Sequence, residues 1–116
     1  MAETFEELRE RYRTFNADRD WDQFHDPKSL ILALVGEVGE LAELFQWVPA
    51  DLAVQAFSEP ARQQRAAEEM SDILIYLMGL ADALDIDLVG AAHSKLTGAE
   101  TRFPPDQVRG VAPFKA

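Results

Sequence analysis

Residues 34–47, with the sequence LVGEVGELAELFQW, repeat apolar side chains at spacings of three and four. That spacing is the period of an amphipathic α-helix, which turns about 100° per residue. The apolar stripe of this helix consists of Leu30, Leu34, Val38, Leu41 and Phe45. Glu37 lies at the border of the stripe, and Glu40 lies about 60° further round. Gly36 and Gly39 each cost a helix about 1 kcal/mol against alanine, which makes sense if something must approach the helix closely.

Helical periodicity extends over most of the chain. The pattern predicts helices over about residues 3–18, 27–47, 58–84 and 87–102, a short turn within 50–57, and an irregular tail over 104–116. Asp26 and Asp87 are predicted helix caps, and Ser58, just before Pro60, is predicted to start the third helix. No segment alternates with the period of two that a strand requires. We therefore expect a single all-α domain over residues 1–116, built as a four-helix bundle.

Composition limits the classes of function. The 116 residues suit one domain, and the 47% hydrophobic content is enough for a core. The formal net charge of −10 argues against nucleic acid as a partner, because such binding needs a basic surface. No apolar run reaches the roughly 18–20 residues of a membrane span, and the acidic start lacks the apolar region of a signal peptide. We expect a cytoplasmic protein with no membrane partner.

Two pairs of carboxylates stand at helical spacing. Glu37 and Glu40 are three residues apart on the second predicted helix, and Glu69 and Asp72 are three apart on the third. Like charges repel at the edge of a core, where lost hydration adds to the cost. A divalent cation removes that cost, and carboxylate oxygens suit Mg²⁺ or Mn²⁺. The competing interpretation is that both pairs belong to solvated helix faces.

Aromatic residues follow each pair. Trp47 lies seven residues after Glu40, and Tyr76 lies one turn after Asp72. Ordinary packing would also place aromatic residues at helical intervals. A di-iron centre of the helical-bundle type is disfavoured, because neither histidine of the chain follows a glutamate at the required spacing.

The third predicted helix is apolar around most of its circumference over residues 73–81, ILIYLMGLA. Such a helix needs partners on several sides, and one chain of this size supplies few. We therefore expect a homo-oligomer.

The segments LALVGEVGELAELFQW and EEMSDILIYLMGLA resemble the MazG-like all-α nucleoside triphosphate pyrophosphatases, and within them the dCTP pyrophosphatase branch. The resemblance covers roughly residues 5–104 and includes the lead-in RDWDQFHDPKSLILALVGE. It implies Mg²⁺-dependent hydrolysis of a nucleoside triphosphate, dCTP or a modified cytosine nucleotide, between its α and β phosphates. It also implies a homotetramer or at least a homodimer.

The same resemblance implies roles for single residues. The metal ligands would be Glu37, Glu40, Glu69 and Asp72, with Glu37 or Glu40 as the general base. The base and sugar would lie against Trp21, His25, Trp47 and Tyr76, and the phosphates against Lys95 and Arg102.

Three positions depart from the family pattern. Tyr12 stands where relatives tend to have histidine, Ala99 replaces an asparagine and Phe103 replaces a tyrosine. The loss of two polar groups leaves open a catalytically weak helical protein that binds nucleotide as a sensor or assembly module. A phosphoribosyl-ATP pyrophosphohydrolase is a further alternative with the same chemistry, which Trp47 and the segment RDWDQFH disfavour. Lys95 and Arg102 could instead be ordinary charges near a helix C-terminus.

Overall fold

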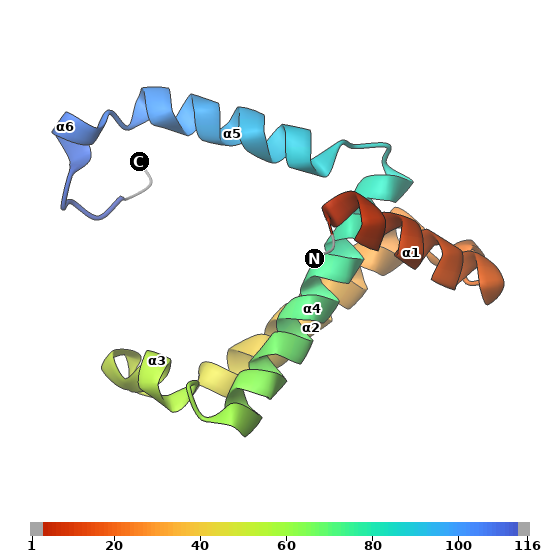
Figure 1. Cartoon of the computed structure of the whole chain (residues 1–116), viewed down its shortest axis with the longest axis horizontal. Helices are drawn as coiled ribbons and strands as arrows, with labels where there is room; N and C mark the ends of the chain where they lie inside the picture. Colours follow the sequence, from red (N-terminus) through yellow and green to blue (C-terminus); the bar gives the residue numbers. More distant parts are fainter. Residues whose placement is uncertain (1–3, 114–116) are drawn as a thin grey trace. The chain divides into compact units, whose positions relative to one another are not determined.

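The computed structural model describes residues 4–113. Its helices, in chain order, are α1 (Phe5–Asp18), η1 (Asp22–Phe24), α2 (Pro27–Phe45), η2 (Ala50–Leu52), α3 (Ala53–Ala56), α4 (Pro60–Ala83), α5 (Leu88–Arg102) and α6 (Pro105–Val108) (Figure 1). There is no strand among the described residues, so the predicted all-α class is confirmed for them. Glu3, the first residue of the predicted first helix, and residues 114–116 of the predicted tail lie outside the described part.

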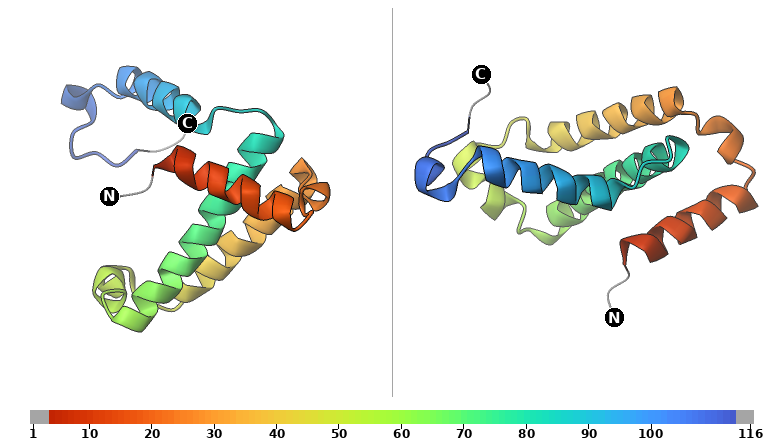
Figure 2. Two further views of the ribbon diagram at one scale, coloured as in Figure 1. Left: turned by 45° about the vertical axis from the view of Figure 1, so that its right-hand side comes forward. Right: turned by 90° about the horizontal axis from the view of Figure 1, so that it is seen from above.

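The chain divides into two compact units, Met1–Asp85 and Ile86–Ala116. In the first unit, α2 and α4 lie side by side and run in opposite directions (Figures 1 and 2). The second unit contains α5 and α6. The predicted four-helix bundle would also require α5, so it stays a prediction.

Side-chain caps account for the N-termini of the four long helices, α1, α2, α4 and α5. The Asp26 carboxylate accepts a hydrogen bond from the Ser29 amide at 2.9 Å, and Asp87 accepts one from the Gly90 amide at 3.1 Å. Both predicted caps are therefore confirmed. The predicted cap at Ser58 was wrong, because the Glu59 carboxylate accepts from the amides of Ala61 and Arg62. The Ser58 hydroxyl instead donates to the Gln55 carbonyl at 2.6 Å and completes the end of α3.

The predicted irregular tail contains one short helix. Pro104 is extended, and Pro105 occupies the first helical position, where its fixed φ and missing N–H are tolerated. The Arg109 amide then donates to the Pro105 carbonyl at 3.0 Å. The expectation of an irregular tail was therefore wrong for Pro105–Val108, because the second proline favours a helical turn after the first has ended α5.

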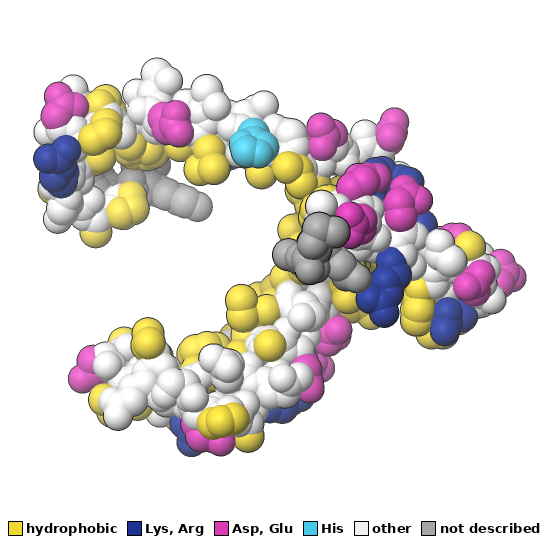
Figure 3. Space-filling model, in the orientation of Figure 1, with side chains coloured by type: hydrophobic (Ala, Val, Ile, Leu, Met, Phe, Trp, Pro, Cys, Tyr) yellow, Lys and Arg dark blue, Asp and Glu magenta, His cyan; other side chains and the backbone are white. Residues whose placement is uncertain are grey.

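The core of the first unit is small. Leu30 of α2 and Met78 of α4 are 2% and 1% exposed, and they are its largest fully buried side chains. Several large apolar side chains remain at the surface in both α2 and α4. Figure 3 shows apolar groups on the visible face of the molecule. No helix within residues 4–113 is long and apolar enough to cross a membrane.

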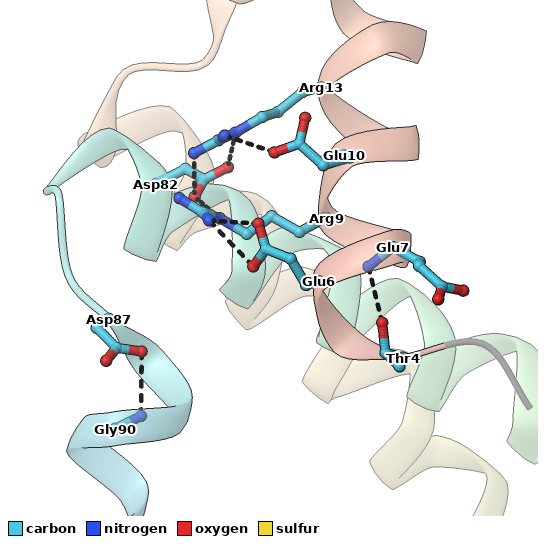
Figure 4. Close-up of polar contacts among 9 residues, drawn as sticks. All are labelled: Thr4, Glu6, Glu7, Arg9, Glu10, Arg13, Asp82, Asp87 and Gly90. Carbon is cyan, nitrogen blue, oxygen red and sulfur yellow. Dashed lines mark hydrogen bonds and ion pairs between the residues drawn. The ribbon is translucent and has the colours of Figure 1, made fainter.

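An ion-pair cluster joins α1 to the C-terminal part of α4 (Figure 4). Arg9 and Arg13 of α1 both donate hydrogen bonds to the Asp82 carboxylate, Arg13 Nε at 3.1 Å. Nearby, the ring of Tyr12 lies against Gly79, where an added Cβ would approach Tyr12 Cε2 at 3.2 Å. These contacts fix the side of α4 that α1 covers, and thereby position the side chains of α1 near the candidate site.

Candidate active site

Three of the four predicted metal-ligand carboxylates lie together between α2 and α4. One carboxylate oxygen from each of Glu37, Glu40 and Glu69 lies within 4.8 Å of the other two. Glu37 and Glu40 share one side of α2 because they are three residues apart, and the antiparallel packing of α4 brings Glu69 to them. Asp72 lies outside this group of three. We call Glu37, Glu40 and Glu69 the acidic cluster.

The cluster contains oxygens that are shielded from water and unpaired. Glu69 is 4% exposed, and its Oε1 lies 3.5 Å from Arg65 Nη2. Within residues 4–113, Glu37 Oε2 and Glu69 Oε2 are buried and have no hydrogen-bond partner. A buried acceptor without a partner costs about 1–3 kcal/mol, and more if it is charged. The cluster is therefore unfavourable unless a proton or a cation occupies it.

The pKa of Glu37 is raised by the same crowding of carboxylates. Two carboxylates can form a hydrogen bond only when one of them is protonated, and this possible bond to Glu69 raises the pKa of Glu37 to about 7. Lost hydration and the negative charges of Glu40 and Asp72 act in the same direction. The single nearby cation, Arg65, pairs with Glu68 as well as Glu69 and is more than half exposed, so among the described residues it compensates only part of the cluster.

A hard divalent cation fits this donor set. The cluster offers only carboxylate oxygens, which Mg²⁺ and Mn²⁺ prefer over nitrogen or sulfur. Two of these oxygens are buried and unpaired, and they lie on helices whose packing holds them in place. A bound cation would neutralise the repulsion and would leave coordination positions for water or phosphate. The cluster therefore has the chemistry of a divalent-cation site.

A hollow of about 160 Å³ lies in the same unit, next to Asp72. Its walls come from α1, from the segment around η1, and from α4: Tyr12, Phe15, Asn16, Trp21, His25, Asp72, Ile75 and Tyr76. We call this the aromatic hollow. Because Asp72 lines the hollow and lies one helical turn after Glu69 on α4, the hollow and the acidic cluster are neighbours.

The aromatic hollow gathers three of the four side chains predicted for the base pocket, namely Trp21, His25 and Tyr76. The fourth, Trp47, does not line it and is 86% exposed. Lys95 and Arg102 lie on α5 in the second unit, where the Arg102 guanidinium lies 5.6 Å from the Phe103 ring centroid. Roles for Trp47, Lys95 and Arg102 in substrate binding stay predictions.

Sequence reasoning missed Phe15 and Asn16 as wall residues. Phe15 packs edge-on against Trp21, with ring centroids 5.7 Å apart. Asn16 is 5% exposed although it is polar. The sequence offered no sign for either residue, because helical periodicity does not reveal which side of α4 the helix α1 will cover.

Carboxylates from two antiparallel helices, next to an aromatic hollow, form an all-helical site whose oxygens could hold a metal ion. The model of the MazG-like family matches residues 33–108. The chain therefore belongs to the MazG-like family.

Individual relatives agree with this assignment. The chain is 49% identical over 110 residues to dCTP pyrophosphatase 1 of Bos taurus, covering 94% of this chain and 64% of the relative. It is 47% identical over 107 residues to dCTP pyrophosphatase 1 of Homo sapiens, covering 91% and 62%. The chain thus spans somewhat less than two thirds of the length of these curated relatives. The crystal structure of a pyrophosphatase from Archaeoglobus fulgidus matches with a TM-score of 0.80 and 33% identity, covering 90% of this chain and 95% of that one.

Proposed function

We propose that this chain is a cytoplasmic, divalent-cation-dependent nucleoside triphosphate pyrophosphohydrolase. Its substrate would be dCTP or a modified cytosine deoxynucleotide, removed to keep the nucleotide pool clean. The observation that carries the proposal is the acidic cluster, with buried, unpaired oxygens on Glu37 and Glu69. The relatives named dCTP pyrophosphatase 1 and the pyrophosphatase from Archaeoglobus fulgidus support the reaction class.

Each carboxylate has a task in this reaction. Glu37, Glu40 and Glu69 would hold Mg²⁺ or Mn²⁺, with Asp72 nearby as the fourth carboxylate. The cation supplies positive charge that neutralises the triphosphate and polarises its phosphorus. Glu37 or Glu40 would accept the proton of the attacking water, as a general base must. The water oxygen bonds to the α phosphorus while the bond from that phosphorus to the bridging oxygen breaks, releasing pyrophosphate.

The aromatic hollow would receive the nucleobase. At about 160 Å³ it is smaller than the roughly 300–1,000 Å³ of a pocket for a whole ligand, so it suits one ring. Trp21, His25 and Tyr76 offer planar surfaces for stacking. Asp72 lines the hollow, and its negative charge acts on Glu37, so a base in the hollow would lie close to the carboxylates that would hold the metal. By family resemblance, Trp47, Lys95 and Arg102 would complete the contacts to sugar and phosphates.

The functional form would be a homotetramer or a homodimer. Exposed apolar side chains of the first unit support this, among them Val35, Trp47 and Met70, which are 60%, 86% and 58% exposed. Each large apolar side chain left in water forgoes roughly 1.5–3 kcal/mol of burial. At Gly36 and Gly39 an added Cβ would meet nothing within 4 Å, so among the described residues nothing already occupies the space beside them. A second copy or a ligand could approach α2 there.

The test is pyrophosphate release from a panel of deoxynucleoside triphosphates with Mg²⁺. Turnover of dCTP supports the proposal, whereas nucleotide binding without turnover favours the sensor alternative suggested by Ala99 and Phe103. Hydrolysis in ¹⁸O-labelled water then identifies the attacked atom. Label in the monophosphate is expected for attack on the α phosphorus, and label in the pyrophosphate would contradict that mechanism.

A further inference from the structure

Asn16 is a buried amide that nothing in the mechanism above uses. It is 5% exposed, and within residues 4–113 its Oδ1 is buried without a hydrogen-bond partner. Native proteins pair nearly all such groups, so each exception calls for an explanation. Asn16 is also a wall residue of the aromatic hollow. The unpaired acceptor therefore belongs to a residue that lines the hollow.

The backbone around Asn16 fixes its position. Near the C-terminus of α1, the Asn16 carbonyl accepts hydrogen bonds from the Trp21 amide at 3.0 Å and the Arg19 amide at 3.3 Å. These bonds connect Asn16 to the turn that carries Trp21, another wall of the hollow. Tyr12, one turn earlier, is held against Gly79 of α4 and stacks with His25 at 6.3 Å between ring centroids. The backbone of Asn16 and the neighbouring wall residues Tyr12 and Trp21 are therefore held in place by these contacts.

The two ends of the carboxamide have different surroundings. Burial raises the pKa of the Tyr12 hydroxyl, and the neighbouring Asn16 side chain opposes this rise. Within residues 4–113, Oδ1 is the carboxamide atom of Asn16 that is buried without a partner, so it is the atom left to accept a hydrogen bond. An acceptor in a small hollow with aromatic walls suits a flat ring that carries an amino group.

A second hollow, of about 260 Å³, shares Tyr12, Asn16 and His25 but is also lined by Arg13, Asp22 and Asp82. Its charged walls do not suit a neutral ring, and Asp82 is already paired with Arg9 and Arg13. The aromatic hollow offers Trp21 and Tyr76 instead, and it adjoins the carboxylates through Asp72. The ring is therefore assigned to the aromatic hollow.

We infer that Asn16 is a specificity-determining residue, whose Oδ1 accepts a hydrogen bond from the 4-amino group of a cytosine ring held in the aromatic hollow. This inference rests on the proposed function for its substrate class. Uracil and thymine carry a carbonyl oxygen in place of that amino group, so they would set two acceptors against each other. A site built around a buried polar group rejects the ligand that cannot pair with it.

The test compares dCTP with dUTP, which differ in the group at position 4 of the ring. For the native chain we expect kcat/KM to favour dCTP by roughly tenfold or more, the effect of one buried hydrogen bond gained and one repulsion avoided. Asn16→Leu, which has similar size and no polar atoms, should bring the ratio to about threefold or less, because it removes the hydrogen bond to dCTP and the repulsion with dUTP. Asn16→Ala repeats the test with a smaller side chain should leucine not fit. Thr14→Val, an exposed change on the same helix, is the matched control and should keep the native ratio.

Binding of dCMP and dUMP, measured by calorimetry on the same four proteins, separates this inference from the proposed function. If no triphosphate is hydrolysed but dCMP binds better than dUMP and Asn16→Leu removes the difference, the inference holds and the catalytic proposal fails. If dCTP is hydrolysed and Asn16→Leu and Asn16→Ala leave the preference unchanged, or weaken both nucleotides equally, the inference is overturned. An equal effect would mean that Asn16 only supports the fold of this region.

Discussion

Glu69 and Asp82 are both acidic residues of α4 that are largely shielded from water, yet their surroundings are opposite. Asp82 receives hydrogen bonds from Arg9 and Arg13, and although lost hydration opposes it, the two guanidinium groups leave the pKa of its carboxyl below the ordinary value (Figure 4). Glu69 faces Glu37 and Glu40, and the pKa of Glu37 rises to about 7. The same helix therefore carries one compensated carboxylate, Asp82, and one, Glu69, that belongs to a group without sufficient positive charge.

This difference in charge compensation indicates where a cation would bind. Two arginines from α1 compensate Asp82, so that region is complete within the chain and serves to attach α1 to α4. Among residues 4–113, the acidic cluster has only Arg65 as a cationic partner, shared with Glu68, and it retains buried oxygens without partners. Repulsion of this kind is tolerated at functional sites, where a bound ion or substrate removes it.

The largest expected effect is on catalysis. Glu40→Gln keeps the shape of the side chain but removes a negative charge from the acidic cluster, so kcat should fall by at least about 100-fold. Glu43→Gln, an exposed change one turn further along α2, is the matched control and should keep native activity. Steady-state kinetics with dCTP and Mg²⁺ measure both, and circular dichroism checks that the helices remain. Native activity in Glu40→Gln would remove the cluster from the mechanism.

The next effect is on stability at the other end of α4. Asp82→Asn should lower the free energy of unfolding by about 1 kcal/mol, since it weakens two charge-assisted hydrogen bonds that are partly exposed to water. Glu10→Gln, which affects only an exposed i, i+3 pair with Arg13, should change it by less than about 0.5 kcal/mol. Urea denaturation of the three proteins gives the comparison. Equal stability of Asp82→Asn and the native chain would mean that these ion pairs do not attach α1.

The smallest effect is a difference in pH dependence, measured with chelator present. The raised pKa of Glu37 means that the folded state binds its proton more tightly than the unfolded state, whose value is 4.5. Its contribution to stability is therefore present below pH 4.5 and is lost as the pH rises through about 7. The lowered pKa of Asp82 gives the opposite sign, with stability present above its ordinary value of 3.8 and lost as the pH falls through its folded value.

Two variants separate these contributions. Glu37→Gln should remove the decline in stability between pH 4.5 and 7, and Asp82→Asn should leave that decline unchanged while reducing acid sensitivity below pH 3.8. Chemical denaturation across that range provides the free energies. A Glu37→Gln profile parallel to the native one would contradict the account of the acidic cluster.

The contrast also shows what sequence alone can predict. The spacing of Glu37 and Glu40, and that of Glu69 and Asp72, were enough to predict that these carboxylates could share a cation, because helical periodicity places each pair on one side of its helix. The exposure of Trp47 and the burial of Asn16 were not predictable in this way. They depend on where α2 ends, at Phe45, and on which side of α4 the helix α1 covers. That side is set by long-range contacts such as Arg9 with Asp82 and Tyr12 with Gly79.

Binding of Mn²⁺ to the purified protein tests the central claim most directly. Electron paramagnetic resonance of free Mn²⁺ gives the number of ions bound without requiring turnover. The account predicts that the native chain and Asp82→Asn bind Mn²⁺ alike, that excess Mg²⁺ displaces it, and that Glu69→Gln loses most of the binding. Equal binding by Glu69→Gln and the native chain, or no binding by the native chain at millimolar Mn²⁺, would contradict it.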